Sequence, residues 1–425
     1  YQMKLQQILS SLQKLHPKEI DLSLDRIKKL CKKLGNPQDN LKYISVVGTN
    51  GKYSTIQAIR AILKDANINC NIYTSPHIQK INERFIYNDE EISDENLVKL
   101  LTEVEDINAG EPITYFEILT AAYFYNAKNF KNNINLLESG LFHRADACSI
   151  IKSNLASVIT AIGLDHLDWL PKNKQTIDQI IFEKTSSLLT SKIIVSKQSS
   201  NETLNKISNS IEKNSSNKII FGNDFNYSLN ENGFFYYEDK YGGIKLPLPN
   251  LEGEFQLSNI STAIATIRNI EEINISDQNI INGIKKIKSI ARFSEIKNGK
   301  LKDLVKNNKI YIDGSHNPLG ASVLCKHLNS LECNKHIILG MMGNKNHVEY
   351  INYFKDKISS LTTVDIPNQP NAINGEDLMK KLKNLKNINY KKSIKEAIKS
   401  IDLKDNDIII ITGSLYLAGE VLNLN

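Results

Sequence analysis

The chain has 425 residues, of which 41% are hydrophobic and 24% are charged, and its formal net charge at pH 7 is +6. This composition is typical of a globular protein and excludes collagen-like, coiled-coil and intrinsically disordered chains. At about 100–200 residues per domain, the length predicts two or three domains, each with its own core.

The sequence also indicates a compartment. No apolar run reaches the ~18–20 residues that a membrane-spanning helix needs, and the first residues lack the apolar stretch of a signal peptide. The five cysteines are scattered without CxxC spacing, which favours free thiols in a reducing compartment over a zinc site or a disulfide framework. We therefore expect a cytoplasmic protein.

The positive charge is mostly lysine. Nucleic-acid-binding proteins usually gather basic residues on one face, whereas the lysines here recur along the whole chain. We therefore expect neither nucleic acid nor a membrane as a partner, with a monomer as the default. In such a chain, arginine should be kept where its planar, forked guanidinium matters. The arginines are Arg26, Arg60, Arg84, Arg144, Arg268 and Arg292.

The first part of the chain predicts helices and parallel strands. Apolar residues spaced three and four apart predict helices over 5–15 and 20–34. A buried strand over 43–47 leads through Gly48-Thr49-Asn50-Gly51-Lys52 into a helix that ends near residue 66. This order favours a parallel sheet. Further strands are expected over 70–73, 134–137, 156–160 and 193–196, with a strand-rich stretch over 225–237 and a helix over 257–270.

The alternation of strands and helices starts again after residues 289–299. It is typical of a doubly wound α/β domain. We therefore expect an α/β protein, with an N-terminal P-loop ATPase domain over 1–295 that has a mostly parallel sheet, and a smaller Rossmann-like domain over 296–425. In the second domain, strands are expected over 310–313, 336–339, 361–364 and 407–411, and helices over 320–328, 348–354, 376–382, 394–401 and from 415.

The glycine-rich loop carries the clearest chemical signal. Its glycines let the backbone approach phosphates, the helix after it offers unpaired N–H groups, and a lysine at its end reaches the transferred phosphate. The alternative is a surface turn with an exposed lysine, which the flanking strand and helix disfavour. We expect ATP to bind Thr49, Asn50, Gly51, Lys52, Tyr53 and Ser54.

The loop matches the G-T-N-G-K-x-S form of the Mur-type amide ligases, and later segments narrow the resemblance. Tyr73-Thr74-Ser75-Pro76-His77 and Asn82-Glu83-Arg84 resemble the T-S-P-H and N-E-R segments of the folylpolyglutamate synthase/dihydrofolate synthase family. The segment 114–120 resembles its T-x-F-E-x-L-T helix start. Segments 138–147, 162–166, 183–184, 313–318 and 412–416 follow in the family's order.

This resemblance implies an ATP-dependent ligase that joins L-glutamate to dihydropteroate, to a (tetrahydro)folate, or to both. Its partners would be small molecules: ATP, the folate-type acid and glutamate. Because a carboxylate lacks a leaving group, ATP would first convert it to an acyl phosphate, which the amine then attacks.

The resemblance also implies roles for individual residues. Ser75, Glu138 and His166 would bind Mg²⁺, although His166 is an unusual ligand for that ion. Lys184 would become carbamylated, and a monovalent cation is a further expected cofactor. Arg292 and Asp313 would contact ATP, and His316 would orient glutamate. Lys52, His166, Lys184, Asp313 and His316 would form the catalytic set, and the substrate would bind Thr74, Pro76, His77, Arg84, Phe116, Glu117, Arg144, His316 and Ser414.

Four residues depart from the family pattern, because Tyr53, Phe142, His143 and Ala291 stand where the family has glycine. If position 53 needed a positive φ, a tyrosine there would cost about 1–3 kcal/mol of strain. The departures leave open a nucleotide- or folate-binding homologue without turnover. A Mur-type peptide ligase is a further alternative, which the T-S-P-H and T-x-F-E segments disfavour.

Overall fold

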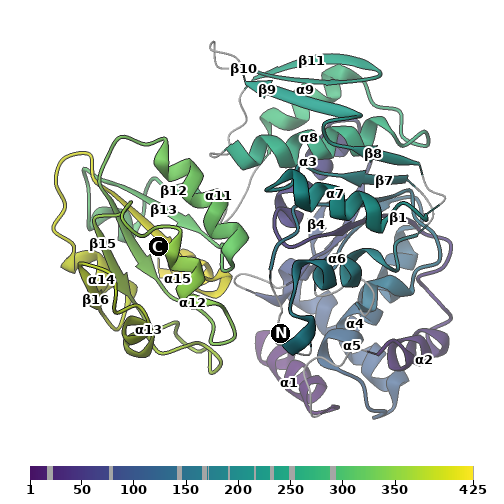
Figure 1. Cartoon of the computed structure of the whole chain (residues 1–425). Coiled ribbons are helices and arrows are strands. Elements are labelled where there is room, and N and C mark those ends of the chain that lie inside the picture. The colour runs from purple at the N-terminus through teal and green to yellow at the C-terminus, as the bar shows by residue number, and fades with distance from the viewer. Residues whose placement is uncertain are drawn as a thin grey trace. The chain divides into compact units, whose positions relative to one another are not determined.

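The computed structural model describes residues 1–16, 23–75, 80–140, 146–164, 170, 172–189, 192–214, 217–229, 234–247, 254–287 and 293–424. The chain forms two compact units (Figure 1). The first comprises Tyr1–Ile162, Ile177–Leu248 and Ser258–Lys286, and the second comprises Gly163–Thr176, Pro249–Leu257 and Ile287–Asn425. The boundary that the sequence suggests, between residues 295 and 296, stays a proposal.

An eight-stranded sheet forms the centre of the first unit, in the order β4-β3-β2-β5-β1-β6-β7-β8. Its strands are parallel from β2 to β8, and β3 and β4 add an antiparallel edge. Strand β5 is buried along its whole length, as expected where helices cover both faces of a parallel sheet. The strands are β1 (Lys42–Val47), β2 (Cys70–Tyr73), β3 (Phe85–Tyr87), β4 (Glu90–Glu91), β5 (Ile134–Glu138), β6 (Ala156–Ile159), β7 (Lys192–Val195) and β8 (Lys218–Ile220).

Helices pack around this sheet. Helix α5 is apolar on nearly all sides and lies in the core. Helices α3 and α9 pack closely at Gly283, where a Cβ would lie only 2.6 Å from the Cα of Ile62. The helices of the first unit are α1 (Gln2–Gln13), α2 (Asp25–Lys33), α3 (Lys52–Asp65), α4 (Asp94–Asn108), α5 (Tyr115–Ala127), α6 (Ile177–Thr185), α7 (Asn201–Ser210), α8 (Glu254–Arg268) and α9 (Asp277–Lys285), with short 3₁₀ turns η1 (Ile81–Arg84) and η4 (Ala147–Ile150).

The strand-rich stretch forms a small antiparallel sheet of its own, in the order β11-β10-β9. Its strands are β9 (Phe225–Leu229), β10 (Phe234–Asp239) and β11 (Gly242–Pro247). Alternate residues such as Phe235, Tyr237 and Leu246 are buried, so one face packs inward. Figure 1 shows this sheet beside α9.

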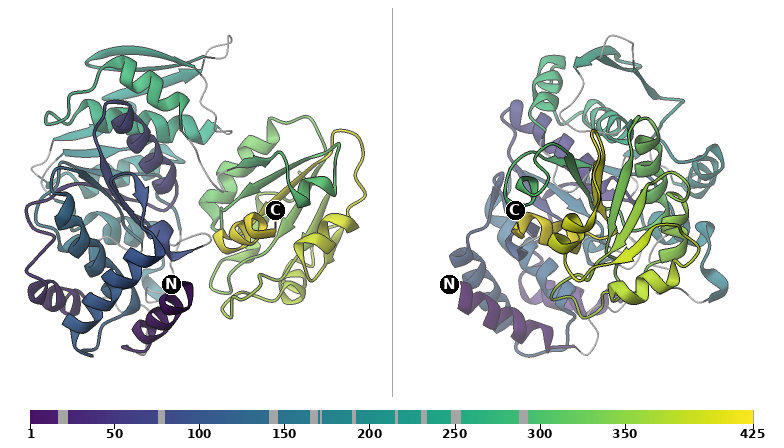
Figure 2. Two further views of the ribbon diagram at one scale, coloured as in Figure 1. Left: turned by 180° about the vertical axis from the view of Figure 1, so that it is seen from behind. Right: turned by 90° about the vertical axis from the view of Figure 1, so that its left-hand side faces the viewer.

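The second unit holds a six-stranded sheet in the order β12-β13-β17-β14-β15-β16. All its strands are parallel except the edge strand β12. Figure 2 shows both units from two further directions. The elements are β12 (Ser294–Ile296), α10 (Lys300–Asp303), β13 (Lys309–Asp313), α11 (Pro318–Asn329), β14 (Lys335–Leu339), α12 (His347–Asn352), β15 (Ser360–Thr363), α13 (Gly375–Lys381), β16 (Ile388–Tyr390), α14 (Ile394–Ser400), β17 (Ile408–Thr412) and α15 (Leu415–Leu424).

These observations confirm the expected fold class, an α/β protein with a mostly parallel P-loop sheet and a smaller doubly wound domain. The five cysteines are free thiols. Among the helices that the structure describes, none combines the length and the apolar character needed to cross a membrane.

Candidate functional site

The glycine-rich loop connects the carboxyl end of β1 to the amino end of α3. Gly48 has φ +148° and Gly51 has φ +86°, backbone conformations that favour glycine. The N–H groups of Thr49 and Asn50 both donate to the carbonyl of Ala161, at 2.9 and 3.1 Å. The loop is therefore fixed to the segment that follows the neighbouring strand β6.

The amino end of α3 is suited to bind an anion. Gly51 occupies the N-cap and has no side chain of its own to cap the helix, and the first turn contains no acidic residue. The first N–H groups of an α-helix have no partner within the helix, so this end can receive a phosphate. Gly51 also lies close to Asn259 of α8, since a Cβ at Gly51 would be 2.5 Å from the Asn259 Oδ1 atom.

Tyr53 and Ser54 lie in the first turn of α3. Tyr53 has no positive φ and adopts the helical conformation, so the departure from glycine carries no backbone strain. The hydroxyl of Ser54 is buried and has no hydrogen-bond partner within the described structure. Such an oxygen is expected to gain a partner when a ligand binds.

Lys52 lies next to the end of β5. Its Nζ donates to the carbonyl of Ser139 at 2.7 Å and is 4.0 Å from Glu138 Oε1. Strands β1 and β5 are parallel neighbours with Val46 opposite Glu138, so both deliver their last residues to the same edge. The structure therefore brings together the predicted phosphate-binding lysine and the predicted metal-binding carboxylate.

Ser75 and Phe116 lie at the same edge. A Cβ at Gly140, just after β5, would be 2.7 Å from the Ser75 hydroxyl oxygen and 3.3 Å from Cζ of Phe116. Only glycine therefore fits between these two side chains without displacing one of them. Gly140 is held in turn by Asp146, whose Oδ2 accepts its N–H at 2.8 Å.

Two further predicted substrate residues lie just after β2 and at the end of η1. Thr74 and Arg84 are both buried. The N–H of Thr74 donates to the carbonyl of Arg84 at 3.4 Å, and its hydroxyl lies 3.5 Å from the carbonyl of Glu83. These contacts bring the segment 73–75 and the Asn82-Glu83-Arg84 segment together.

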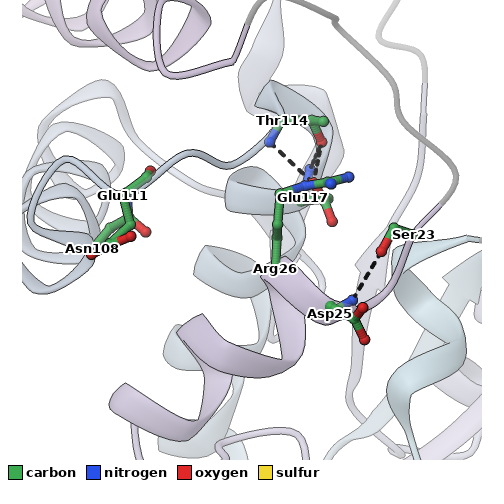
Figure 3. A network of polar contacts seen from close by, with 7 residues as sticks. All are labelled: Ser23, Asp25, Arg26, Asn108, Glu111, Thr114 and Glu117. Carbon is green, nitrogen blue, oxygen red and sulfur yellow. Dashed lines mark hydrogen bonds and ion pairs between the residues drawn. The ribbon is translucent and has the colours of Figure 1, made fainter.

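Glu117 forms a capping box at the start of α5 (Figure 3). Its Oε1 accepts hydrogen bonds from the N–H and the hydroxyl of Thr114, at 3.1 and 2.8 Å. The Thr114 hydroxyl in turn accepts the N–H of Glu117 at 3.2 Å. The same Oε1 accepts from Nε of Arg26 on α2 at 2.8 Å. The T-x-F-E pattern therefore has a direct structural reason, which is to begin a helix.

A second polar cluster lies at the carboxyl edge of the other sheet. Asp313 at the end of β13 accepts the N–H of Ser315 at 2.8 Å and that of Phe293 at 2.9 Å. The Ser315 hydroxyl lies 2.9 Å from Tyr350 Oη and 3.3 Å from Thr412 Oγ1. Burial raises the pKa of Tyr350, so its hydroxyl stays protonated.

His316 and Ser414 belong to the same edge of the second unit. His316 follows β13, is half-buried, and has its Nδ1 3.1 Å from the carbonyl of Gly314. Ser414 follows β17, is buried, and accepts the N–H of Tyr416 at 3.0 Å. Ligands of open α/β sheets usually bind at this edge.

Lys184 lies near the end of α6 and is only 1% exposed. The preceding residue Glu183 is also buried and accepts a hydrogen bond from Gln179 at 3.0 Å. A lysine this buried is expected only where its charge is compensated or removed.

Other predicted site residues lie outside the described residues, namely Pro76, His77, Arg144, His166 and Arg292. Phe142, His143 and Ala291 lie outside them as well. Within the described ranges, no three His, Cys, Asp or Glu side chains gather so that they could hold a metal ion.

The sequence analysis missed three residues with a place in this arrangement. Asn259 contacts the phosphate loop, Asp146 holds Gly140, and Arg26 pairs with Glu117. Asp146 stands in a family-like segment, and Arg26 is one of the few arginines. Asn259 carries no sequence signal beyond being a polar residue on a helix.

Known proteins resemble this chain over nearly its whole length. A family model described as "Mur ligase, glutamate ligase domain" matches residues 300–415. The dihydrofolate synthase/folylpolyglutamate synthase of Escherichia coli (strain K12) is 26% identical over 419 residues, 98% of this chain and 94% of its own. The protein of the same name from Bacillus subtilis (strain 168) is 29% identical over 420 residues, 94% of each chain. The solved structure of E. coli FolC in complex with DHPP and ADP has 26% identity and a TM-score of 0.85, covering 99% of this chain and 97% of its own.

Proposed function

Because this chain belongs to the folylpolyglutamate synthase/dihydrofolate synthase family, we propose that it is an ATP-dependent ligase that joins L-glutamate to dihydropteroate, to a reduced folate, or to both. The observation that carries the proposal is the position of Lys52 at the amino end of α3, with its Nζ 4.0 Å from Glu138 Oε1. An amine, an anion-binding helix end and a carboxylate at one sheet edge suit phosphoryl transfer.

The reaction has two steps. The carboxylate of the folate-type acid attacks the γ-phosphorus of ATP, which forms an acyl phosphate and releases ADP. The amino group of glutamate then attacks the acyl carbon, so that an amide bond forms, phosphate leaves and the amine loses a proton. Lys52 and the first N–H groups of α3 neutralise the phosphate charge, and Phe116 lies beside Gly140 and Ser75, where we place the acid.

The residues at this edge fit Mg²⁺. Ser75 and Glu138 offer a hydroxyl and a carboxylate oxygen, which are ligands that Mg²⁺ accepts. The buried Ser54 hydroxyl has no protein partner among the described residues, so a phosphate oxygen or a metal-bound water would satisfy it. When bound, Mg²⁺ supplies further neutralisation of phosphate charge. His166 is a third proposed ligand by resemblance.

The second unit contributes to glutamate addition in this proposal. Its sequence matches the glutamate ligase family model over residues 300–415. Asp313 and Arg292 are proposed to contact ATP, and His316 and Ser414 to act on glutamate. The remaining proposed substrate residues are Thr74, Pro76, His77, Arg84, Glu117 and Arg144.

Two finer features of the chemistry are also proposed. Lys184 is carbamylated: its neutral amine adds CO₂ and loses a proton, which would replace a buried cation with an anion. Native mass spectrometry in bicarbonate buffer should show a gain of about 44 Da, the mass of one CO₂, that Lys184→Arg lacks. A monovalent cation supports turnover, and exchange of K⁺ for a large organic cation tests this.

Cytoplasmic location is proposed from the five free thiols, which suit a reducing compartment.

The main test measures phosphate release by the purified protein with ATP, Mg²⁺ and glutamate. Dihydropteroate and tetrahydrofolate are compared as acids, with a UDP-muramyl peptide as the control for a Mur-type peptide ligase. We expect turnover that requires both glutamate and a folate-type acid. ATP binding without product for every folate tried would refute the proposal and favour a binding protein without turnover.

A further inference from the structure

Arg26 forms a hydrogen bond between helix α2 and the start of the core helix α5. It lies on α2, and its Nε donates to Glu117 Oε1 of α5 at 2.8 Å, although 91 residues separate the two in sequence. Its side chain is 21% exposed and that of Glu117 only 5%. Figure 3 shows the guanidinium directed at the carboxylate. The contact is therefore a charge-assisted hydrogen bond in a partly buried setting, where it is electrostatically stronger than it would be in water.

The hydrogen bond from Arg26 holds the carboxylate of Glu117, which also forms the capping box of α5. Glu117 Oε1 accepts both the N–H and the hydroxyl of Thr114, whereas Oε2 is buried and has no partner in the described structure. The nearest compensation for the buried negative charge is thus Arg26. Without it, Glu117 would keep an uncompensated charge at a buried position, which favours release of the capping box.

The first turn of α5 also carries Phe116. The capping box closes over Thr114, Tyr115, Phe116 and Glu117, so its release would allow this turn to fray. Phe116 is the side chain that stands beside Gly140 and Ser75. Fraying would therefore move an aromatic ring at the proposed acid site, while leaving the phosphate loop on β1 and α3 unchanged.

We propose that Arg26 is a positioning residue for the folate-type acid, which acts through Glu117 to hold the first turn of α5 and with it Phe116. This inference rests on the proposed function. It predicts that Arg26 affects binding of the acid far more than binding of ATP. A merely structural ion pair would lower stability without separating the two substrates.

Arg60 provides a matched control. Its Nε lies 3.3 Å from Asp89 Oδ1, with side-chain exposures of 23% and 7%, close to those of the Arg26–Glu117 pair. Asp89 also accepts the N–H of Cys70 at the beginning of β2, the opposite end of that strand from Ser75. Arg60→Gln therefore removes a similar ion pair in the same unit, far along the strand from the acid.

The experiment compares Arg26→Gln, Arg26→Lys and Arg60→Gln in the full chain. For Arg26→Gln we expect the KM for dihydropteroate to rise about tenfold, which corresponds to about 1.4 kcal/mol. The KM for ATP and the kcat should stay within about twofold. Arg26→Lys should recover part of the loss, and Arg60→Gln should change neither KM.

Hydrogen exchange gives a readout that does not depend on turnover. In Arg26→Gln, the amides of residues 115–118 should exchange faster, while those of α3 keep their protection. Unchanged exchange there would overturn the inference whether or not the wild type turns over. Equal effects of Arg26→Gln and Arg60→Gln on the KM for dihydropteroate would overturn it too. Loss of wild-type turnover with every folate would instead refute the proposed function.

Discussion

Replacing Gly51 by alanine tests whether the phosphate loop depends on its contact with α8. Gly51 has φ +86°, and its missing Cβ would lie 2.5 Å from Asn259 Oδ1. Gly35, which follows α2, has nearly the same φ of +84° but no atom within 4 Å of a Cβ. The two glycines therefore share the backbone conformation and differ in their surroundings.

The expected magnitudes follow from this difference. A left-handed conformation costs alanine about 1–2 kcal/mol, of which the reduced entropy of the unfolded chain returns about 0.4–1 kcal/mol. Gly35→Ala should therefore lower the free energy of unfolding by roughly 1 kcal/mol. Gly51→Ala should lose a further 1–3 kcal/mol, because the buried Asn259 side chain must move away from the new methyl group.

Urea unfolding followed by circular dichroism measures stability, and calorimetric titration with a non-hydrolysable ATP analogue measures affinity. We expect Gly51→Ala to weaken nucleotide binding at least tenfold and Gly35→Ala to leave it unchanged. In a double-mutant cycle with Asn259→Ala, the Gly51→Ala loss should shrink by about 1–2 kcal/mol. Equal stability losses for the two glycine variants, together with unchanged nucleotide affinity, would refute the reasoning.

Three further predictions concern single residues. Lys52→Met should lower phosphate release about 10²–10³-fold, since the lysine neutralises charge that develops during transfer; a smaller fall would contradict its role. Tyr53→Gly should not raise turnover and should cost roughly 0.5 kcal/mol of stability, because Tyr53 is helical and unstrained; a gain in activity would support the binding-protein alternative. Burial alone would raise the pKa of Asp407, but hydrogen bonds, first that of His336 at 2.9 Å, outweigh it and lower the pKa below 3.8. The ionised carboxylate therefore stabilises the fold above about pH 4 and less as the pH falls further, so Asp407→Asn should destabilise at pH 7 with a gap that narrows below pH 4 in acid unfolding.

The local parts of the fold could be predicted from the sequence. The phosphate loop and the strands on either side of it are read from adjacent residues, because strand, glycine turn and helix follow directly in the chain. The short strands β3, β4, β8, β12 and β16, which lie at or next to the edges of their sheets, are not among the expected strands. A strand of two or three residues is too short to show an alternation of apolar and polar residues, and whether it forms depends on pairing with an adjacent strand.

The expectations give no bounds for helices α4 and α7, and α4 lies in a stretch between two expected strands where helical structure is expected in general terms. Helix α4 has its apolar residues at helical spacing and a Ser93 N-cap that accepts the N–H of Asn96, so its signal is present in the sequence. Helix α7 buries only Ile207, and such a polar helix gives little periodicity. Long amphipathic helices are thus easier to predict from the sequence than short polar ones.

The site divides in the same way. Lys52 is predicted from the glycine-rich loop itself, whereas Ser75 and Glu138 are expected only because their segments resemble those of the family. The structure shows that parallel strands bring these segments to one edge. Asn259 and Arg26 act through contacts with residues far away in the chain. The residues next to them in the sequence do not indicate that Asn259 approaches Gly51 or that Arg26 pairs with Glu117, so the folded structure is needed to identify these contacts.

The two backbone hydrogen bonds of Asp313 affect how any variant at this position is interpreted. The carboxylate accepts the N–H of Ser315 and that of Phe293, a buried residue with φ +45° that stacks on Tyr311 at 4.5 Å. Asp313→Ala would therefore remove the hydrogen bond that holds the left-handed backbone of Phe293, the residue just before β12. It would also remove the proposed contact with the nucleotide. A low activity of Asp313→Ala could therefore come from the lost backbone hydrogen bonds or from the lost nucleotide contact. Phe293→Gly perturbs the backbone at Phe293 but keeps the Asp313 carboxylate, so comparing the two variants separates these causes.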